Sequence, residues 1–332
     1  MSVYRFLLIS DLHLCVEYRR RNFLSLSRKR PSSAIDVARS AYRNGFMSLF
    51  HPSSYVPSRL RGLSEFVYSH ENDIDGVLIC GDLSTSGTAT DLTFSFQYLD
   101  SSATRLWRSG NRDVFPFARK NEILVVPGNH DHYDSNSPSP NSQNFRLQFG
   151  KYLKKFQGGR VGFDVVGDRL GYIAFVMADF SFQRSTDAKG KAHLYGGGAV
   201  DDATLNELRI TTSHVRKSLP TEVPLHICWV IHFAPYDTRV ASLQLTNYEE
   251  VISAAKQLAV DTIFCGHTHE MTFKKDGNVS IFCAASATAV DCTNMVHLAE
   301  FDRASGKLKI WNHSWDVENV CFSEMGDLIP IN

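Results

Sequence analysis

The sequence carries no excess of charge of either sign, with 35 Lys and Arg against 35 Asp and Glu among 332 residues. A balanced chain gives no global indication of a nucleic-acid or membrane partner, because such partners select a large positive excess. No stretch approaches the roughly 18 apolar residues that a membrane-spanning helix needs. The N-terminal apolar run is too short for a secretion signal, and Asp11 interrupts it. We therefore expect a cytoplasmic protein with no transmembrane segment.

The sequence also lacks the cysteine pattern of a disulfide framework or a zinc ribbon. Its seven cysteines are odd in number, scattered and without a CxxC pair: Cys15, Cys80, Cys228, Cys265, Cys283, Cys292 and Cys321. Several lie inside apolar runs, where a reduced thiol behaves as a small hydrophobic side chain. This usage indicates a reducing compartment. The chain has no internal repeat and no low-complexity tract, which excludes a repeat protein.

What the sequence does contain is a recurring pattern of short apolar runs that end abruptly in polar residues able to bind metals. The five runs are FLLIS before Asp11-Leu12-His13, GVLIC before Gly81-Asp82, ILVVP before Gly128-Asn129-His130-Asp131, ICWVI before His232, and TIFC before Gly266-His267-Thr268-His269. Continuous apolar runs of this length are typical of strands that are buried on both faces.

The segments between these runs have the spacing of amphipathic helices, as at Leu60, Leu63, Phe66 and Val67. Alternation of strands and helices predicts an α/β layered fold. Ligands of such folds gather outside the carboxyl ends of the strands, and we therefore expect the five strand ends to converge on one site. Further expected elements are a strand at 171–179, a helix capped by Asp201, and a C-terminal β-hairpin at about 295–315.

The strand ends supply seven candidate metal ligands, which are carboxylates, an amide and imidazoles without a thiolate. They are Asp11, His13, Asp82, Asn129, His232, His267 and His269. This set suits Mn²⁺, Fe²⁺/Fe³⁺ or Zn²⁺ better than an all-oxygen calcium site. Seven ligands exceed what one ion needs, but they fit two ions if one carboxylate bridges. Two ions about 3.5–4 Å apart can clamp the attacking and leaving oxygens of a displacement at phosphorus.

The five blocks, taken in order, resemble the signature of the calcineurin-like metallophosphoesterases. That signature runs D-x-H, GD, GNH followed by an acid, a lone His, and GHxH. This chain has DLH at 11–13, GD at 81–82, GNHD at 128–131, His232, and GHTH at 266–269. The resemblance spans residues 5 to about 290. It implies a four-layer αββα sandwich of two mixed β-sheets flanked by helices, as a single domain over 1–332.

The resemblance also implies a role for each residue. The first metal would be bound by Asp11, His13 and His269, and the second by Asn129, His232 and His267. Asp82 would bridge the two metals, and a hydroxide between them would be the nucleophile. His130 would not be a ligand: it directly follows Asn129, and its ring can therefore face the substrate to protonate the leaving oxygen or hydrogen-bond to the phosphate.

Two features depart from the protein Ser/Thr phosphatase branch of the family. There the second block reads GDxVDRG and the third block ends in Glu, whereas this chain has GDLSTSG and Asp131. Protein phosphatase activity is therefore disfavoured, and His130 lacks its usual carboxylate partner. The pattern is closer to the bacterial cyclic-nucleotide phosphodiesterase-like branch.

Compared with compact members of the family, the chain also has a long segment at about 15–62, which we interpret as a basic helical insertion. Its cations are Arg19, Arg20, Arg21, Arg28, Lys29 and Arg30. They would suit a phosphate-rich partner or an anionic lipid, but a solvated helix face is the more common reason for such a run, and we favour it. His132 and Tyr133 have two interpretations that stay open, contact with substrate and packing of their loop.

Together these observations predict a phosphoric ester hydrolase that uses two metals, and more specifically a phosphodiesterase of a small phosphate ester such as a nucleotide. Within the class, a nucleotidase, a lipid-precursor pyrophosphatase and a nuclease are alternatives. From another class, a non-catalytic protein-interaction scaffold on the same fold is a further alternative. Because all seven ligand positions and His130 carry suitable residues, the sequence favours the enzyme.

Overall fold

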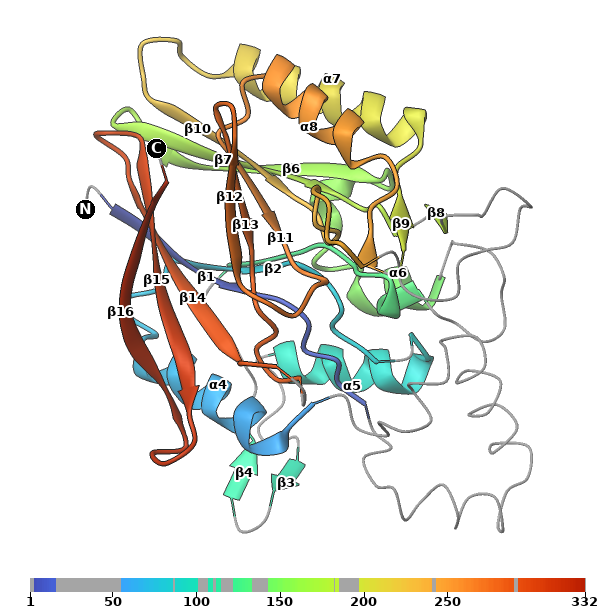
Figure 1. Ribbon diagram of the computed structural model, residues 1–332, viewed down its shortest axis with the longest axis vertical. Coiled ribbons are helices and arrows are strands. Elements are labelled where there is room, and N and C mark those ends of the chain that lie inside the picture. The colour runs from blue at the N-terminus through green and yellow to red at the C-terminus, as the bar shows by residue number, and fades with distance from the viewer. Residues whose placement is uncertain are drawn as a thin grey trace.

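We analysed a computed structural model of the chain (Figure 1). It describes residues 3–15, 55–85, 87–100, 107–109, 112–114, 122–132, 143–181, 183–184, 197–240, 243–289 and 292–331. Most of the predicted basic insertion, including its cluster of Arg and Lys residues, lies outside these ranges. No helix in the described part of the chain is long and apolar enough to cross a membrane.

Two six-stranded sheets form the centre of the molecule. The first sheet has the order β16-β15-β14-β1-β2-β5, with the bounds Cys321–Ile331, Lys307–Asp316, Met295–Asp302, Val3–Ile9, Gly76–Ile79 and Glu122–Val125. The second sheet has the order β12-β13-β11-β10-β7-β6, with the bounds Thr272–Asp276, Val279–Cys283, Thr262–Cys265, Leu225–Val230, Gly171–Ala178 and Val161–Asp168. Two short two-stranded pairs are separate from them: β3 Trp107–Ser109 with β4 Arg112–Val114, and β8 Gln183–Arg184 with β9 Gly198–Ala199.

Both sheets are mixed. In the first sheet β1 is parallel to β2, and β2 to β5, whereas β14, β15 and β16 are antiparallel additions. In the second sheet β7, β10, β11 and β13 are parallel, and the outer strands β12 and β6 are antiparallel. The apolar runs found in the sequence are these parallel strands, and they are buried because each sheet is covered on both faces.

Helices cover the outer face of each sheet (Figure 1). Their bounds are α4 Pro57–Ser69, α5 Ala89–Leu99, α6 Gln143–Phe149, α7 Asp202–Ser218 and α8 Tyr248–Gln257, with two short 3₁₀ helices at His130–His132 and Lys154–Phe156. The helices α4 and α5 pack on the first sheet, and α7 and α8 on the second. Leu60 and Leu63 of the predicted helical pattern lie in α4 and are fully buried.

The layer between the two sheets consists mainly of aromatic and branched side chains. Phe6 of β1 packs edge-on against Phe175 of β7 and Phe264 of β11, with ring centroids 5.1 and 5.7 Å apart. Such edge-to-face pairs contribute about 0.5–1.5 kcal/mol beyond the burial of their area. This packed layer fixes the sheets face to face. The predicted four-layer αββα sandwich is therefore confirmed.

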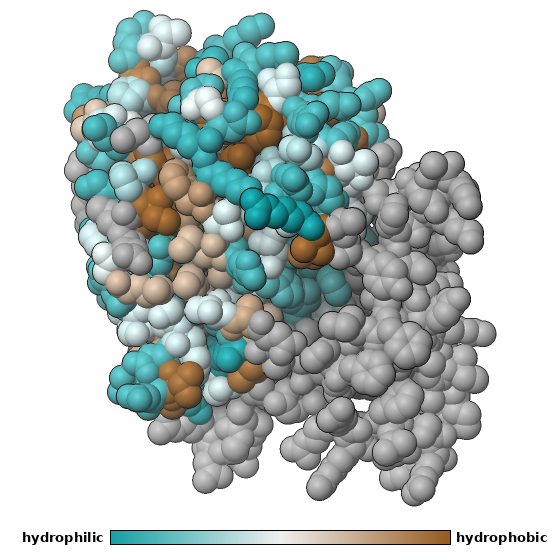
Figure 2. Space-filling model, viewed as in Figure 1, coloured by the Kyte–Doolittle hydropathy of each residue, from teal (hydrophilic) through white to brown (hydrophobic). Residues whose placement is uncertain are grey.

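The outer surface is mainly hydrophilic where the amphipathic helices turn their polar faces to solvent. Figure 2 shows mainly hydrophilic residues over the region of α7 and α8, with smaller hydrophobic areas among them. In α7, Leu205, Leu208 and Val215 face the sheet, and Asp201 caps the helix by accepting a hydrogen bond from the amide of Thr204 at 2.7 Å.

The C-terminal part is larger than the sequence pattern indicated. The strands β14 and β15 pair as an antiparallel hairpin, and β16 then pairs with β15 at the edge of the sheet. Sequence analysis did not predict β16, because Gly326 and Pro330 interrupt its pattern. Proline is tolerated at a sheet edge, where its missing N–H faces no neighbouring strand.

One buried hydrogen bond ties α7 to the second sheet. The indole N–H of Trp229 donates to the hydroxyl of Thr212 at 2.9 Å, and both side chains are fully buried. We expect Thr212→Val to lower the free energy of unfolding by about 1–3 kcal/mol, because the indole N–H is left buried without an acceptor. Denaturant unfolding measures the change. The matched control is Thr211→Val on the same helix, which is only partly buried and should change stability by less than about 0.5 kcal/mol.

Candidate metal centre

The five polar blocks follow the carboxyl ends of five parallel strands from both sheets. Asp11 comes after β1, Asp82 after β2 and Asn129 after β5, while His232 and His267 come after β10 and β11. Backbone hydrogen bonds connect adjacent blocks: the amide of Asp11 donates to Gly81, and the amide of Gly266 donates to His232, at 3.0 and 2.9 Å. The structure therefore brings all five blocks to one edge of the sandwich.

Three of the predicted ligands form a first group. The Oδ1 atom of Asp11 lies 3.7 Å from Nε2 of His13 and 3.5 Å from Nε2 of His269, and the two imidazole nitrogens are 2.9 Å apart. Asp11 and His13 are buried, whereas the side chain of His269 is 37% exposed. This group thus opens to solvent on the side of His269, as a substrate would require.

A second group lies beside the first. Its members Asp82, His232 and His267 each place one ligand atom within 4.8 Å of the other two, and all three are buried. The Oδ1 atom of Asn129 lies 3.0 Å from Nε2 of His232. The seven predicted ligands therefore fall into two neighbouring sets rather than one.

Asp82 lies between the two sets. Its Oδ2 atom is 3.3 Å from Nε2 of His232 in the second group and 3.8 Å from Nε2 of His13 in the first group. Its other oxygen, Oδ1, accepts a hydrogen bond from the amide of His130 at 2.8 Å, which fixes the orientation of the carboxylate. Among the described residues, Asp82 is thus the carboxylate placed to serve both groups.

Buried polar atoms without partners indicate that these groups suit cations. In the described part of the chain, Oδ1 of Asp11 and Nε2 of His267 are buried and have no hydrogen-bond partner. Leaving such atoms unpaired costs about 1–3 kcal/mol each, and folded proteins usually avoid it. A metal ion supplies the missing partner, and carboxylate, amide and imidazole donors together match Mn, Fe or Zn.

The backbone at these positions is held in an uncommon conformation. Nine non-glycine residues of the described ranges have a positive φ, and five of them are predicted ligands: Asp11, His13, Asp82, His267 and His269, with φ from 47° to 73°. Such left-handed residues cost about 1–3 kcal/mol each and cluster at functional sites, where the surrounding structure enforces them. The strain therefore marks this edge of the sandwich as a functional site.

Glycines of the motifs allow the ligands to approach the backbone closely. A Cβ atom on Gly128 would overlap with the carboxylate of Asp82, one on Gly81 would meet the ring of His232 at 2.5 Å, and one on Gly266 would overlap with the hydroxyl of Ser10. The glycines of these three blocks are thus required by contact with a predicted ligand or with the neighbouring loop.

Gly128→Ala should therefore displace Asp82 and weaken metal binding by about 10-fold or more, as losses of supporting contacts around a metal usually do. Elemental analysis of the dialysed protein would measure the loss. Gly150→Ala is the matched control, because its added Cβ has a single close neighbour, the carbonyl of Arg146 at 3.1 Å, in another part of the fold. Full metal content in Gly128→Ala would contradict the argument.

The protonation states of the imidazoles depend on their burial and on the neighbouring carboxylate of Asp82. Burial lowers the pKa of His13 to about 4 and that of His267 to about 3, and both rings are therefore neutral at pH 7. Burial acts in the same direction on His232, but the neighbouring carboxylate of Asp82 outweighs it and raises the pKa of His232 to about 10. Binding of a cation at this position would release the proton of His232, because a ligating imidazole must be neutral.

The ring of His232 is oriented by a backbone carbonyl. Its Nδ1 lies 2.7 Å from the carbonyl of Cys80, to which the Nδ1–H donates. This contact directs Nε2 toward Asp82 and Asn129. Ligating histidines usually have such a second hydrogen bond, which selects the tautomer and increases the basicity of the ligating nitrogen.

His130 lies at the mouth of the site. Its Nδ1–H donates to the carbonyl of Thr85 at 2.7 Å, and its ring packs edge-on against that of His13 with centroids 4.7 Å apart. One ring nitrogen of His130 also lies within 4.8 Å of ligand atoms of His13 and Asp82. The geometry is therefore compatible with a non-ligand facing substrate and also with a ligand.

Sequence analysis missed the role of Asp131. This buried carboxylate accepts hydrogen bonds from the amides of Leu83, Ser84 and Gly128 at 3.2, 2.8 and 3.0 Å. It thereby joins the loop after β2 to the loop after β5. Burial and the nearby charge of Asp82 raise the pKa of Asp131 to about 6. The acid that ends the third block thus holds two ligand loops together rather than orienting His130.

Asp179 is a second residue that the sequence signal could have identified. It follows the apolar strand β7 in the same way as the ligands follow their strands, but only the strand was predicted. Its Oδ2 lies 3.4 Å from Nε2 of His132, and both residues are buried. This pair supports the packing interpretation of His132.

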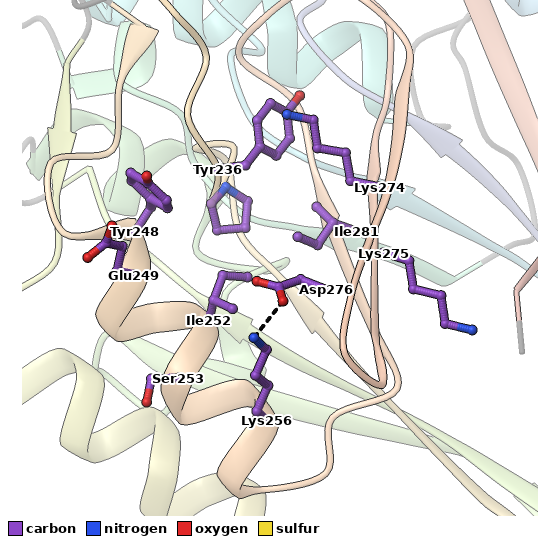
Figure 3. Close-up of a pocket in the computed structure, with 11 residues that line it drawn as sticks. Tyr236, Tyr248, Glu249, Ile252, Ser253, Lys256, Lys274, Lys275, Asp276 and Ile281 are labelled. Atoms are coloured by element: carbon purple, nitrogen blue, oxygen red, sulfur yellow. Dashed lines mark hydrogen bonds and ion pairs between the residues drawn. The ribbon is translucent and has the colours of Figure 1, made fainter.

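A surface pocket of about 380 Å³ lies apart from the metal centre, between α8 and the hairpin of β12 and β13 (Figure 3). None of the seven predicted ligands lines it. Lys256 forms an ion pair with Asp276 at 2.5 Å, and Lys274 lies over the ring of Tyr236 at 3.9 Å from its centroid. Lys275 extends away from the others. Lys256 and Lys274 thus have local partners. Because none of the predicted ligands lines the pocket, it is not part of the candidate site.

The fold and its site define a metal-binding α/β sandwich, and sequence comparison gives the family. The family model of calcineurin-like phosphoesterases matches residues 4–271. The chain therefore belongs to the calcineurin-like phosphoesterase family, a class of enzymes that hydrolyse phosphoric esters. The resemblance inferred from the five motifs and the predicted enzyme class are thus confirmed.

Solved structures agree with this fold. The chain is similar to a dimetal phosphatase from Danio rerio, with 12% identity, a TM-score of 0.59, and coverage of 99% of this chain and 98% of the other. It is also similar to GAP50, described as the anchor in the inner membrane complex of Plasmodium, with 11% identity, a TM-score of 0.54, and coverage of 99% and 89%. At such identities the similarity concerns the fold alone. No curated protein matches the sequence.

Proposed function

We propose that the protein is a phosphodiesterase that depends on two metal ions and hydrolyses a small phosphate ester such as a nucleotide. The observation that carries the proposal is the meeting of seven suitable donors in two adjacent groups, with Asp82 placed within 3.8 Å of an imidazole nitrogen in each. One carboxylate shared by two sets of ligands is what a pair of ions requires for displacement at phosphorus.

In this proposal Asp11, His13 and His269 hold one ion, Asn129, His232 and His267 hold the other, and Asp82 binds both. When bound, two ions such as Mn²⁺, Fe²⁺/Fe³⁺ or Zn²⁺ would neutralise charge on the phosphoryl oxygens and lower the pKa of water. The neutral amide of Asn129 limits the negative charge of the site, which would otherwise repel a phosphate.

His130 would act on the substrate rather than on the ions. Its Nδ1–H is directed to the carbonyl of Thr85, and Nε2 is therefore the atom that carries the transferable proton when the ring is charged. That proton would pass to the leaving oxygen as its bond to phosphorus breaks.

The second block favours a diesterase over a protein phosphatase. Where the phosphatase signature has its second Asp, this chain has Thr85, whose hydroxyl donates to the carbonyl of His13 at 2.5 Å. Ser84 likewise donates to Asp131 at 3.1 Å. These two positions hold the loops of the site. The Arg of the phosphatase block, which could bind the dianion of a phosphomonoester, is replaced by Ser86 in this sequence.

A substrate comparison in the presence of Mn²⁺ tests this choice. We expect faster hydrolysis of bis-(p-nitrophenyl) phosphate and of cyclic nucleotides than of p-nitrophenyl phosphate. A clear preference for the monoester would reject the diesterase and favour a nucleotidase or another phosphatase. Activity on none of them, with metal bound, would direct the search to lipid-precursor pyrophosphates and nucleic acids.

A scaffold on the same fold is the alternative from another class. The similarity to GAP50, which is described as an anchor, means that the fold alone does not decide between catalysis and assembly. The retained donors favour the enzyme, because a scaffold has no need for buried, unpaired ligand atoms. Elemental analysis separates the two: the enzyme needs about two metals per chain. We propose the cytoplasm as the compartment, because scattered cysteines without a CxxC pair are typical of proteins in a reducing environment.

A further inference from the structure

The segment that follows β13 runs directly beside the loop of the first block. The backbone of Ser286 pairs with that of Ser10, and the amide of Ala287 donates to the carbonyl of Ser10 at 3.2 Å. The side chains of Ser286 and Thr288 are fully buried there. Neither belongs to any of the five motifs, yet both point at the backbone that carries Asp11.

Three successive carbonyls of that loop each accept a hydrogen bond from a different hydroxyl. Asp11 accepts from Ser286 at 2.7 Å, Leu12 from Thr288 at 2.7 Å, and His13 from Thr85 at 2.5 Å. We call Ser286, Thr288 and Thr85 the hydroxyl clamp. Because each peptide plane has a carbonyl fixed at one end, the clamp determines the backbone path over the two ligands.

The hydroxyl proton of Ser286 has one available direction. The amides of Thr288 and Ala289 both donate to its oxygen, at 3.3 and 2.9 Å, and thus occupy the lone pairs. A hydroxyl has one proton and two lone pairs, and its proton therefore goes to the carbonyl of Asp11. The hydroxyl of Ser286 is therefore fixed in its direction toward Asp11, whereas the hydroxyl of an exposed serine could rotate toward water.

The clamp acts where the backbone needs support. Asp11 and His13 have φ values of 55° and 47°, a left-handed conformation that each residue would leave if unrestrained. The amide of Ser286 also donates to the carbonyl of His269 at 3.3 Å. The clamp and its backbone thus contact all three residues assigned to the first ion.

The second group is supported by other contacts. His232 is held through the carbonyl of Cys80, and Asp82 through the amide of His130. In the described part of the chain, no side-chain hydrogen bond of the clamp reaches His232, His267 or Asn129. One contact joins the groups, since the amide of His267 donates to Oδ2 of Asp11 at 3.0 Å. Loss of a clamp hydroxyl should therefore affect the first ion more than the second.

We propose that Ser286, Thr288 and Thr85 are positioning residues for the first metal ion, and that they set its affinity without touching it. This inference rests on the proposed metal centre and deepens it. The proposal assigns a function to the segment after β13, which lies outside the motifs. It predicts that the affinity for the first ion depends on the hydroxyl groups of these side chains rather than on the volume of the side chains.

The experiment compares Thr288→Val, which keeps the shape and removes the hydroxyl, with Thr288→Ser, which keeps the hydroxyl. Calorimetric titration of metal-free protein with Mn²⁺ measures both affinities, and His269→Ala identifies which of them belongs to the first ion. We expect Thr288→Val to weaken the first affinity by about 10- to 100-fold and to weaken the second affinity much less. Thr288→Ser should bind both ions as the wild type does.

Two further variants complete the design. Ser280→Ala is the matched control, because Ser280 is also fully buried and its hydroxyl has no partner in the described part of the chain; its Mn²⁺ binding should be unchanged. Thr85→Val removes a clamp hydroxyl from a different loop and should reproduce the selective loss, even if Thr288→Val fails to fold. Melting of each variant in EDTA separates folding from metal binding.

Three results would contradict the role of the hydroxyl clamp but not the proposed metal centre. The first is wild-type Mn²⁺ affinity in both Val variants, and the second is an equal loss of affinity for both ions. The third is an equal loss of affinity in Thr288→Val and Thr288→Ser. Wild-type protein that binds no Mn²⁺, Fe²⁺ or Zn²⁺ would overturn the proposed function and the clamp with it. The two failures are therefore distinguishable in a single set of titrations.

Discussion

Asp82→Asn is expected to remove turnover and to lower the metal content well below the roughly two ions per chain expected of the wild type. The replacement keeps the size of the side chain and its contact with the amide of His130, but removes the charge that faces both groups of ligands. A neutral amide bridges two cations poorly, because the repulsion between them is no longer offset. No other substitution of one ligand should affect both ions.

The measurement is elemental analysis combined with the hydrolysis of bis-(p-nitrophenyl) phosphate. Asp168→Asn is the matched control: this half-exposed carboxylate pairs with Arg303 at 2.9 Å, at the end of β6, and should leave both readouts unchanged. Asp82→Asn protein that retains two tightly bound ions would show that Asp82 does not bridge, and the assignment of the two groups would then be wrong.

His130→Ala is expected to leave both ions bound and to lower kcat by about 10²–10⁴-fold, the usual contribution of a positioned acid. The physical reason is that the ring lies at the open side of the site, with Nδ1 occupied by the carbonyl of Thr85. An effect on kcat at constant metal content would be strongest for substrates with a poor leaving group, since these depend most on protonation.

The same variant also tests whether His130 is a metal ligand or an acid that faces the substrate, since the geometry is compatible with both. A nitrogen of His130 lies close enough to His13 and Asp82 to ligate the first ion. If His130→Ala loses one ion, the residue is a ligand and its proposed role as an acid is wrong. His214→Ala, at an exposed position of α7, is the control for removal of an imidazole and should change neither kcat nor metal content.

The sequence was sufficient to predict the architecture and the meeting of the five blocks. Each block follows an uninterrupted apolar run, and parallel strands of one sheet end at the same edge, so that position along the chain implied position in space. The edge strand β16 was missed because a glycine and a proline hide its pattern. The residue types of the predicted ligands also suit the chemistry that we propose for them.

The supports of the site could not be predicted in this way. Ser286 and Asp11 are 275 residues apart, and a buried serine after an apolar strand carries no signal of its own. Asp131 was visible only as the end of a motif, while its three amide partners depend on how two loops meet. Such contacts depend on tertiary packing, which local sequence patterns do not encode.

The distribution of the predicted ligands between the two sheets has a mechanical consequence. The first sheet contributes Asp11, His13, Asp82 and Asn129, and the second contributes His232, His267 and His269. Each proposed ion would therefore be a cross-link between the two layers, and opening of the sandwich would require its release. Binding to the native state alone adds about 2.7 kcal/mol of stability at a free-ion concentration of 100 times Kd. Resistance to heat would then report occupancy without any substrate.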